Sequence, residues 1–347
     1  MAPLRAAIAA PVPPGLTELI TSREPRLELL YDPELLPPMR HPADFTGDPA
    51  FQRTKAQQYA YEALIDTADV LYGIPDVDGD ALRRAVRANK GLRWVHTMAA
   101  GGGATVKAAQ LTEDELRRVV FTSSAGVHRD PLAEFALFGV LAGAKQLPRL
   151  NAQQRARDWG DRWLMGQLSE QTVLVVGLGG IGSRVVELLA AFGATIIGTS
   201  RRPRDLPVVE VIHPDELVAV AGRIDAVVST LPGTAATAGL LGSRFFAALK
   251  PGATIVNVGR GTVIDEPALI AALQSGQVGF AALDVFAVEP LPADSPLWSF
   301  PNVLVSPHRA ALSVHEDRRI AELFTENASR LLDGRPLLNV IDPVEFY

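Results

Sequence analysis

Short runs of apolar residues alternate with amphipathic stretches along the chain. This pattern is typical of parallel α/β units, in which a helix follows each buried strand. A first series predicts five strands, which are Leu4–Ala10, Leu27–Tyr31, Val70–Gly73, Arg93–Thr97 and Val119–Thr122. Helical patterns lie between them at Ala50–Thr67 and Asp80–Asn89, and Leu36–Pro49 is predicted to be an ordered loop.

A second series begins near Asp130 with a helix from Pro131 to about Gln146. Proline suits a helix start because its missing N–H has no intrahelical partner there. Six strands follow, which are Thr172–Val176, Thr195–Gly198, Ala226–Ser229, Thr254–Val258, Gly279–Asp284 and Val303–Val305. A last helix, Val314–Asp333, stops at Gly334 and is expected to pack back onto the first domain.

The two series predict an α/β protein with two doubly wound parallel sheets. A length of 347 residues also suits two domains. We place the first domain at residues 1–127 and 312–347, so that it is discontinuous, and the second at residues 128–311.

Composition narrows the function classes. The chain has 33 basic and 39 acidic residues, a net charge of −6 and no long basic run, which argues against nucleic-acid binding. It has no cysteine, which excludes disulfides, thiolate metal sites and cysteine nucleophiles. Prolines interrupt the apolar N-terminus, which predicts a first strand rather than a signal peptide, and no run has the length of a membrane span. We therefore expect a cytoplasmic protein without a metal site.

A glycine-rich turn follows the strand Thr172–Val176 and precedes a helix at Ser183–Phe192. In such a turn the first glycine permits the tight bend, the second lets a pyrophosphate approach, and the third lets helix and strand pack closely. The helix start adds free N–H groups and a positive dipole end. The turn therefore predicts a dinucleotide site, with contacts from Gly177, Gly179, Gly180, Ile181 and Gly182.

The end of the next strand indicates which dinucleotide is bound. NAD-binding proteins usually carry an acidic residue there, but this chain has Ser200, Arg201 and Arg202, and its first carboxylate is Asp205, beyond Arg204. Guanidinium groups pair with a phosphate, which a carboxylate would repel. This favours NADP(H) over NAD(H), and the alternative is that the arginines form a solvated loop.

Three charged residues follow successive strands of the second series. Arg260 lies in NVGRG, Glu289 in DVFAVEP and His308 in SPHRA. Reduction of a 2-keto acid needs a cation for the carboxylate and ketone, a proton donor, and a partner that keeps the donor protonated. Arg260, His308 and Glu289 suit these roles in turn. Each alone could be an ordinary loop residue, but their joint occurrence at strand ends favours a catalytic set.

The chain resembles the D-isomer-specific 2-hydroxyacid dehydrogenase family over nearly its full length. The residues that carry the resemblance are GLGGIG, STLPGTAAT at Ser229–Thr237, NVGRG, DVFAVEP and SPHRAA, in this order. The resemblance implies a Rossmann cofactor domain, a flavodoxin-like substrate domain, and Arg260, Glu289 and His308 as catalytic residues. It adds cofactor contacts at Leu231, Pro232, Thr237, Val258, Gly259 and Asp284.

The resemblance also implies a substrate loop at Thr97–Gly103 whose backbone N–H groups bind the substrate carboxylate opposite Arg260. The substrate contacts would be Met98, Ala100, Gly101, Gly102, Arg260 and His308. Family members are usually homodimers, and the helix near Pro131 would be the linker and dimerisation element.

Two segments depart from the family pattern. The run Gly101–Gly103 is expected to make the substrate loop mobile. The loop Met39–Arg53 is unusually long and could line a pocket with His41, Phe45 or Arg53, although we favour a role in covering the domain edge.

Within the family, Glu289 argues against formate dehydrogenase, and Thr97-Met98 with the arginine-rich strand end resembles glyoxylate/hydroxypyruvate reductases. We therefore expect a reductase of small 2-keto acids. The alternative is a non-enzymatic NAD(P)H-sensing protein on the same scaffold, and the chain shows no long disordered tail or peptide-recognition extension that would favour it.

Overall fold

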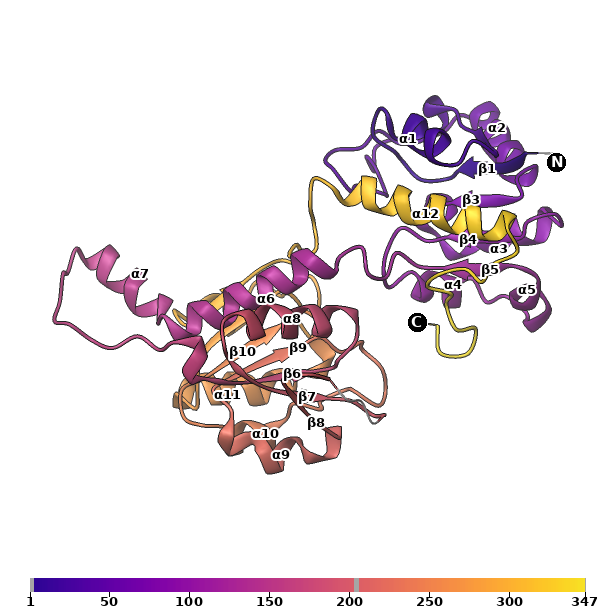
Figure 1. Ribbon diagram of the computed structural model, residues 1–347. Helices are drawn as coiled ribbons and strands as arrows, with labels where there is room; N and C mark the ends of the chain where they lie inside the picture. The colour runs from indigo at the N-terminus through magenta and orange to yellow at the C-terminus, as the bar shows by residue number, and fades with distance from the viewer. Residues whose placement is uncertain (1–2, 203–205, 347) are drawn as a thin grey trace. The chain divides into compact units, whose positions relative to one another are not determined.

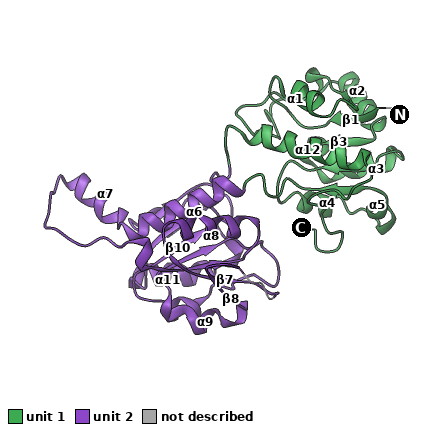
Figure 2. Ribbon diagram, viewed as in Figure 1, with its two compact units in different colours: residues 1–128, 312–347 green, residues 129–311 purple. Residues whose placement is uncertain are grey.

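A computed structural model describes residues 3–202 and 206–346 (Figure 1). The chain forms two compact units (Figure 2), unit 1 with Met1–His128 and Leu312–Tyr347, and unit 2 with Arg129–Ala311. It therefore passes from one unit to the other twice. Among the described residues, no helix combines the length and apolarity of a membrane span.

Unit 1 contains a five-stranded parallel sheet with the order β2-β1-β3-β4-β5, the flavodoxin-like arrangement. Its strands are β1 (Leu4–Ile8), β2 (Leu27–Leu30), β3 (Val70–Tyr72), β4 (Trp94–His96) and β5 (Val120–Thr122). Its helices are α1 (Leu16–Arg23), α2 (Lys55–Asp66), α3 (Gly79–Ala88), α4 (Gly103–Ala108), α5 (Glu113–Arg118) and α12 (Glu316–Leu332).

Helix α12 returns from the end of the chain to pack on the sheet of unit 1. Phe324 of α12 stacks on Trp94 of β4 with ring centroids 4.9 Å apart, and meets Tyr72 of β3 edge-on at 5.0 Å. All three side chains are fully buried. Aromatic side chains bury large apolar areas, so these contacts fix α12 on the sheet.

Unit 2 contains a seven-stranded parallel sheet with the order β12-β11-β10-β9-β6-β7-β8, a Rossmann arrangement. Its strands are β6 (Thr172–Val176), β7 (Thr195–Thr199), β8 (Val209–Ile212), β9 (Ala226–Ser229), β10 (Ala253–Asn257), β11 (Val278–Leu283) and β12 (Val303–Val305). Its helices are α6 (Arg129–Ala144), α7 (Leu147–Ala156), α8 (Gly180–Ala191), α9 (Leu217–Val220), α10 (Ser243–Ala248) and α11 (Glu266–Ser275).

The observed elements correct the sequence prediction at a few places. The prediction of six strands in unit 2 was wrong because it missed β8, a short edge strand beside β7. The prediction of a helix from Ala50 was also wrong, since α2 begins at Lys55. Thr54 caps this helix by accepting a hydrogen bond from the N–H of Gln57, whose side chain accepts one from the N–H of Thr54. This capping box fixes the helix start.

Candidate active site

The three charged residues predicted to act in catalysis follow three adjacent strands of unit 2. Arg260 follows β10, Glu289 follows β11 and His308 follows β12, and these strands are neighbours in the sheet. Because the strands are parallel, all three residues lie beyond the same edge of the sheet. This carboxyl edge is where ligands bind in open α/β sheets.

Glu289 and His308 form a direct hydrogen bond. His308 Nδ1 lies 2.6 Å from Glu289 Oε2, and Glu289 Oε1 accepts a bond of 2.9 Å from the N–H of Phe286. Burial raises the pKa of Glu289, but the bonds from His308 and Phe286 and the charge of Arg260 hold it below its ordinary value. Glu289 is therefore ionised at neutral pH and can stabilise a protonated imidazole.

His308 keeps one ring nitrogen free for a ligand. Its Nε2 has no hydrogen-bond partner among the described residues, and 48% of its side chain is exposed. The arrangement suits proton transfer, because one nitrogen is fixed by a carboxylate while the other can reach a substrate.

Arg260 lies in a loop that packs tightly against the loop after β11. A Cβ atom at Gly261 would lie 1.8 Å from the backbone carbonyl carbon of Phe286, so only glycine permits this approach. The buried Asn257 side chain donates a hydrogen bond of 3.1 Å to the Arg260 carbonyl oxygen. The Arg260 residue itself is exposed. Its backbone is therefore held in place while its guanidinium remains open to a ligand.

The buried Asp284 organises the loop that carries His308. Its Oδ1 accepts hydrogen bonds from the N–H groups of Arg309, at 2.8 Å, and Ala310, at 2.9 Å, and from the Ser306 hydroxyl. His308 has a φ of 53°, a left-handed conformation that non-glycine residues seldom adopt. Asp284 was predicted as a cofactor contact, which stays a prediction, and sequence reasoning missed its part in holding this loop.

The turn Gly177–Gly182 lies at the switch point of the sheet, where the chain leaves β6 with β7 on one side and β9 on the other. Gly177 has a φ of 101°, and a Cβ at Gly182 would lie 1.9 Å from its carbonyl oxygen. A Cβ at Gly179 or Gly180 would meet no atom within 4 Å. The turn is thus closed toward the protein and open on its other side. This fits a pyrophosphate, which the N–H groups at the start of α8 can bind.

The other predicted cofactor residues of unit 2 lie in loops that touch one another. A Cβ at Gly259, after β10, would lie 2.5 Å from the carbonyl oxygen of Leu231, after β9. Thr237 donates a hydrogen bond of 2.6 Å to the Pro232 carbonyl oxygen, and Val258 is 2% exposed. The structure therefore brings these five residues to the same sheet edge as the glycine turn.

Arg201 and Arg202 follow β7 and are exposed. The N–H of Arg202 donates to the Ser200 hydroxyl at 3.3 Å, and neither guanidinium pairs with a carboxylate among residues 3–202 and 206–346. Arg204 and Asp205, which the cofactor prediction also weighed, lie outside the described residues. The two described arginines remain free to bind a phosphate.

The predicted substrate loop belongs to unit 1, whereas Arg260 and His308 belong to unit 2. Met98 is buried, but Ala99, Ala100 and Gly101 are exposed, and their N–H groups donate no hydrogen bond to another described residue. The N–H of Gly102 differs, because it donates to the Ala99 carbonyl oxygen at 3.2 Å. The N–H groups of Met98 and Gly103 also donate no hydrogen bond to another described residue, but those two residues are buried. The exposed free amides are therefore those of residues 99–101, a suitable cradle for an anion.

Two of the three glycines in this loop are closely packed, and the mobility that the sequence suggests for the run stays a prediction. Gly102 and Gly103 are buried. A Cβ at Gly102 would lie 1.9 Å from Thr97 Oγ1, and one at Gly103 would lie 1.9 Å from the carbonyl oxygen of Phe346. The absence of side chains thus serves close packing here.

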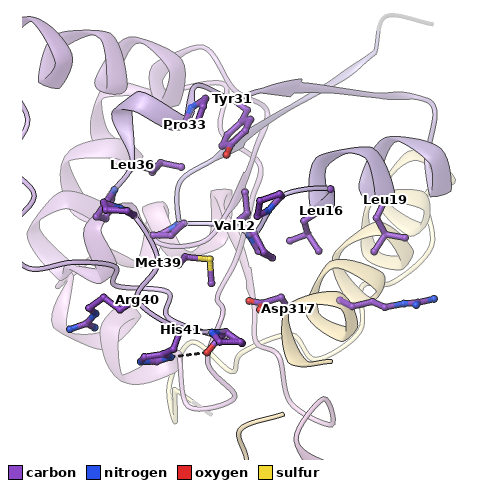
Figure 3. Close-up of a pocket in the computed structure, with 18 of the residues that line it drawn as sticks. Val12, Leu16, Leu19, Tyr31, Pro33, Leu36, Met39, Arg40, His41 and Asp317 are labelled. Atoms are coloured by element: carbon purple, nitrogen blue, oxygen red, sulfur yellow. Dashed lines mark hydrogen bonds between the residues drawn. The ribbon is translucent and has the colours of Figure 1, made fainter. Parts of the chain in front are cut away.

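A cavity of about 1070 Å³ lies within unit 1 (Figure 3). Apolar and proline side chains from residues 11–19 and 31–42 form most of its wall, with His41 and the first turn of α12 completing it. This cavity belongs to unit 1, whereas the charged trio belongs to unit 2. His41, one of the three residues that the sequence suggested as pocket-lining, therefore lines this cavity.

Arg53, at the end of the long loop, contacts three other segments of unit 1. Its Nη1 donates to Asp76 Oδ1 at 2.8 Å, its Nε donates to the Leu35 carbonyl oxygen at 2.5 Å, and its guanidinium lies 3.8 Å from the Tyr61 ring centroid. Phe45 packs against the core of unit 1. Arg53 and Phe45 also line a second pocket of unit 1, of about 600 Å³, so the contacts fit both a covering and a pocket-lining role.

The sequence was compared with protein families and known proteins. Residues 137–310 match the model of the "D-isomer specific 2-hydroxyacid dehydrogenase, NAD binding domain". The chain belongs to the D-isomer specific 2-hydroxyacid dehydrogenase family. It is thus an NAD(P)-dependent oxidoreductase that acts on the CH–OH group of 2-hydroxy acids.

Three relatives illustrate the similarity. Glyoxylate reductase from Aeropyrum pernix is 33% identical over 83% of this chain and 88% of its own length. Glyoxylate/hydroxypyruvate reductase B from Yersinia enterocolitica is 32% identical over 65% of this chain and 72% of its own. A family member from Xanthobacter autotrophicus Py2, solved with NADPH and MES, is 30% identical with a TM-score of 0.78 and covers 100% of both chains. The fold and the family prediction are confirmed.

Proposed function

We propose that this dehydrogenase reduces small 2-keto acids, such as glyoxylate or hydroxypyruvate, with NADPH. The observation that carries the proposal is the 2.6 Å hydrogen bond between His308 and Glu289, beside Arg260. Two relatives are named for glyoxylate reduction, which supports this substrate class. No observation favours the alternative of a non-enzymatic sensor.

Each of the proposed catalytic residues has a separate role in the reaction. Arg260 binds the substrate carboxylate and polarises the keto group. Nicotinamide, when bound, supplies the hydride. His308 gives its Nε2 proton to the keto oxygen, so that hydride and proton together complete the 2-hydroxy acid. Glu289 remains ionised throughout and holds the ring. In oxidation the neutral ring takes the hydroxyl proton back.

The cofactor preference follows from the loop after β7. Arg201 and Arg202 are exposed, and neither has a carboxylate partner among the described residues. A 2′-phosphate would supply that partner through charge-assisted hydrogen bonds. The relative from Xanthobacter was solved with NADPH, which supports NADP(H) as the preferred cofactor.

We also propose that two copies of the chain form a homodimer. Helix α7 and the segment after it project from the rest of unit 2 (Figure 1). On this arm Trp159 is 98% exposed and Leu164 is 92% exposed. Large apolar side chains gathered on one exposed segment usually mark an interface. Sedimentation should give a dimer for the natural chain and a monomer for Leu164→Glu, and a monomeric natural chain would refute the proposal.

The test of the activity is a panel of 2-keto acids with NADPH and NADH, followed by the absorbance of the reduced cofactor. We expect glyoxylate or hydroxypyruvate to oxidise NADPH faster than NADH. His308→Ala at the same concentration gives the background, because it keeps the fold and lacks the proton donor. If no keto acid raises oxidation above this background, the proposed function is wrong.

A further inference from the structure

A buried chain of hydrogen bonds lies under the substrate loop of unit 1. Trp94 Nε1 bonds to Thr122 Oγ1 at 2.8 Å, and that oxygen lies 2.9 Å from His96 Nδ1. On the other side of the ring, His96 Nε2 lies 3.2 Å from Ser124 Oγ, which bonds to the Thr97 carbonyl oxygen at 2.9 Å. All four side chains of this relay, Trp94, Thr122, His96 and Ser124, are fully buried.

The protonation of the ring and the last bond of the relay fix the directions of its hydrogen bonds. Burial lowers the pKa of His96 to about 3, so the ring is neutral at neutral pH and carries one N–H. The Thr97 carbonyl can only accept, so the Ser124 hydroxyl donates its one proton there and accepts a hydrogen bond from the N–H at His96 Nε2. His96 Nδ1 therefore accepts from the Thr122 hydroxyl, which in turn accepts from the Trp94 indole N–H.

The relay ends on the first residue of the substrate loop. Thr97 Oγ1 donates to the Ala99 carbonyl oxygen at 3.0 Å, and the N–H of Ser124 reaches the same oxygen at 3.4 Å. The N–H of Gly102 donates to that oxygen as well, at 3.2 Å. The carbonyl oxygens of Thr97 and Ala99 thus accept the hydrogen bonds that hold the loop. The exposed N–H groups of residues 99–101 make none.

We propose that His96 is a positioning residue for substrate recognition, acting through Ser124 and Thr97 to hold the loop in the conformation that leaves the exposed amides of residues 99–101 free for the substrate carboxylate. The inference rests on the proposed function, since the anion is the carboxylate of the 2-keto acid. His96 touches neither substrate nor cofactor in this role. It sets the geometry of the groups that do.

The test compares two neighbouring buried serines. Ser124→Ala removes the relay hydroxyl, whereas Ser123→Ala removes a hydroxyl that only accepts from the N–H of Ala125, at 3.4 Å, and serves as the matched control. We expect Ser124→Ala to raise the KM for glyoxylate by roughly tenfold, as for a buried donor left without its partner. The kcat should fall less than the KM rises. The KM for NADPH should stay unchanged, because the glycine turn belongs to unit 2.

Two further measurements separate positioning from general damage. Ser124→Thr restores a hydroxyl and should bring the KM back toward the natural value. The pH profile of Ser124→Ala should match that of the natural chain, since His96 does not titrate near neutral pH. An unchanged KM for the keto acid, an equal rise in Ser123→Ala, or a loss confined to kcat would overturn the proposal.

Failure of the proposed function would be distinct. Suppose that none of the keto acids tested is a substrate of the natural chain. Hydrogen exchange of the peptide spanning Thr97–Gly103 would then still test the relay. Faster exchange in Ser124→Ala than in Ser123→Ala would support the positioning role, because the loop would open more often. Equal exchange rates would contradict it.

Discussion

In unit 2 the proposed catalytic residues are charged side chains beyond the ends of β10, β11 and β12, whereas in unit 1 the proposed substrate loop offers backbone amides held by uncharged buried side chains. The two parts also differ in exposure. The trio is reachable by solvent, with 48% of the His308 side chain exposed, while the four relay side chains are fully buried. Proton transfer needs an accessible group whose protonation can change. Holding a carboxylate needs geometry that does not change with pH.

This comparison predicts that changes in unit 2 act on kcat and on cofactor binding, while changes in the relay act on the KM for the keto acid.

The largest effect is expected at the proton donor. His308→Ala should lower kcat by about 10²- to 10⁴-fold, the usual contribution of a general acid. Binding of NADPH, measured by fluorescence titration, should be retained. His213→Ala, another exposed histidine of unit 2, is the control, and an equal loss there would remove the assigned role of His308.

The glycine turn offers a pair of variants with opposite expected results. Gly182→Ala would place a Cβ 1.9 Å from the Gly177 carbonyl oxygen, and such overpacking costs about 1–3 kcal/mol, so the Tm should fall. Gly179→Ala meets no protein atom within 4 Å and should leave the Tm unchanged. It should nevertheless weaken NADPH binding by about thirtyfold, or about 2 kcal/mol, by filling the open side of the turn. Unchanged NADPH affinity in Gly179→Ala would show that the pyrophosphate binds elsewhere.

Sequence reasoning could propose the charged residues of unit 2 because their residue types indicate their chemistry. Arg260, Glu289 and His308 follow strands whose apolar runs are easy to read, and parallel topology brings strand ends together. The glycine turn was predictable for the same reason, since strand, turn and helix are contiguous in sequence.

The uncharged part could not be recovered in this way. Thr122 and Ser124 are ordinary residue types, and they reach Trp94 and His96 across a separation of 28 positions in each case. Only the pairing of β4 with β5 brings them together. The strand β8 was missed because a short edge strand has a weak periodic signal. Local patterns therefore predicted the elements and the charges, and tertiary contacts decided the rest.

The arginine pair after β7 should separate the two cofactors. Arg201→Ala combined with Arg202→Ala should raise the KM for NADPH by about ten- to a hundredfold, because charge-assisted bonds to the 2′-phosphate are lost. The KM for NADH should change little. Arg244→Ala, an exposed arginine on α10, is the matched control. Equal losses for both cofactors would contradict the 2′-phosphate assignment.

A smaller effect is expected from the carboxylate beside the histidine. Glu289→Gln keeps the size of the side chain but removes the charge that stabilises the protonated ring. The alkaline fall of the reduction rate should therefore move to lower pH. The pKa of Glu289 lies below its ordinary value, so the natural chain keeps this charge on the mildly acid side as well. Ser124→Ala, which changes unit 1 alone, should leave the profile in place.

The pH dependence of both reaction directions in the natural chain tests the central assignment most directly. Reduction uses the protonated form of His308 and oxidation uses the neutral form, so kcat for reduction should fall with rising pH while kcat for oxidation increases. In Glu289→Gln both curves should move to lower pH. A kcat for reduction that increases with pH, or curves that Glu289→Gln leaves in place, would contradict the assignment of the proton transfer to the His308–Glu289 pair.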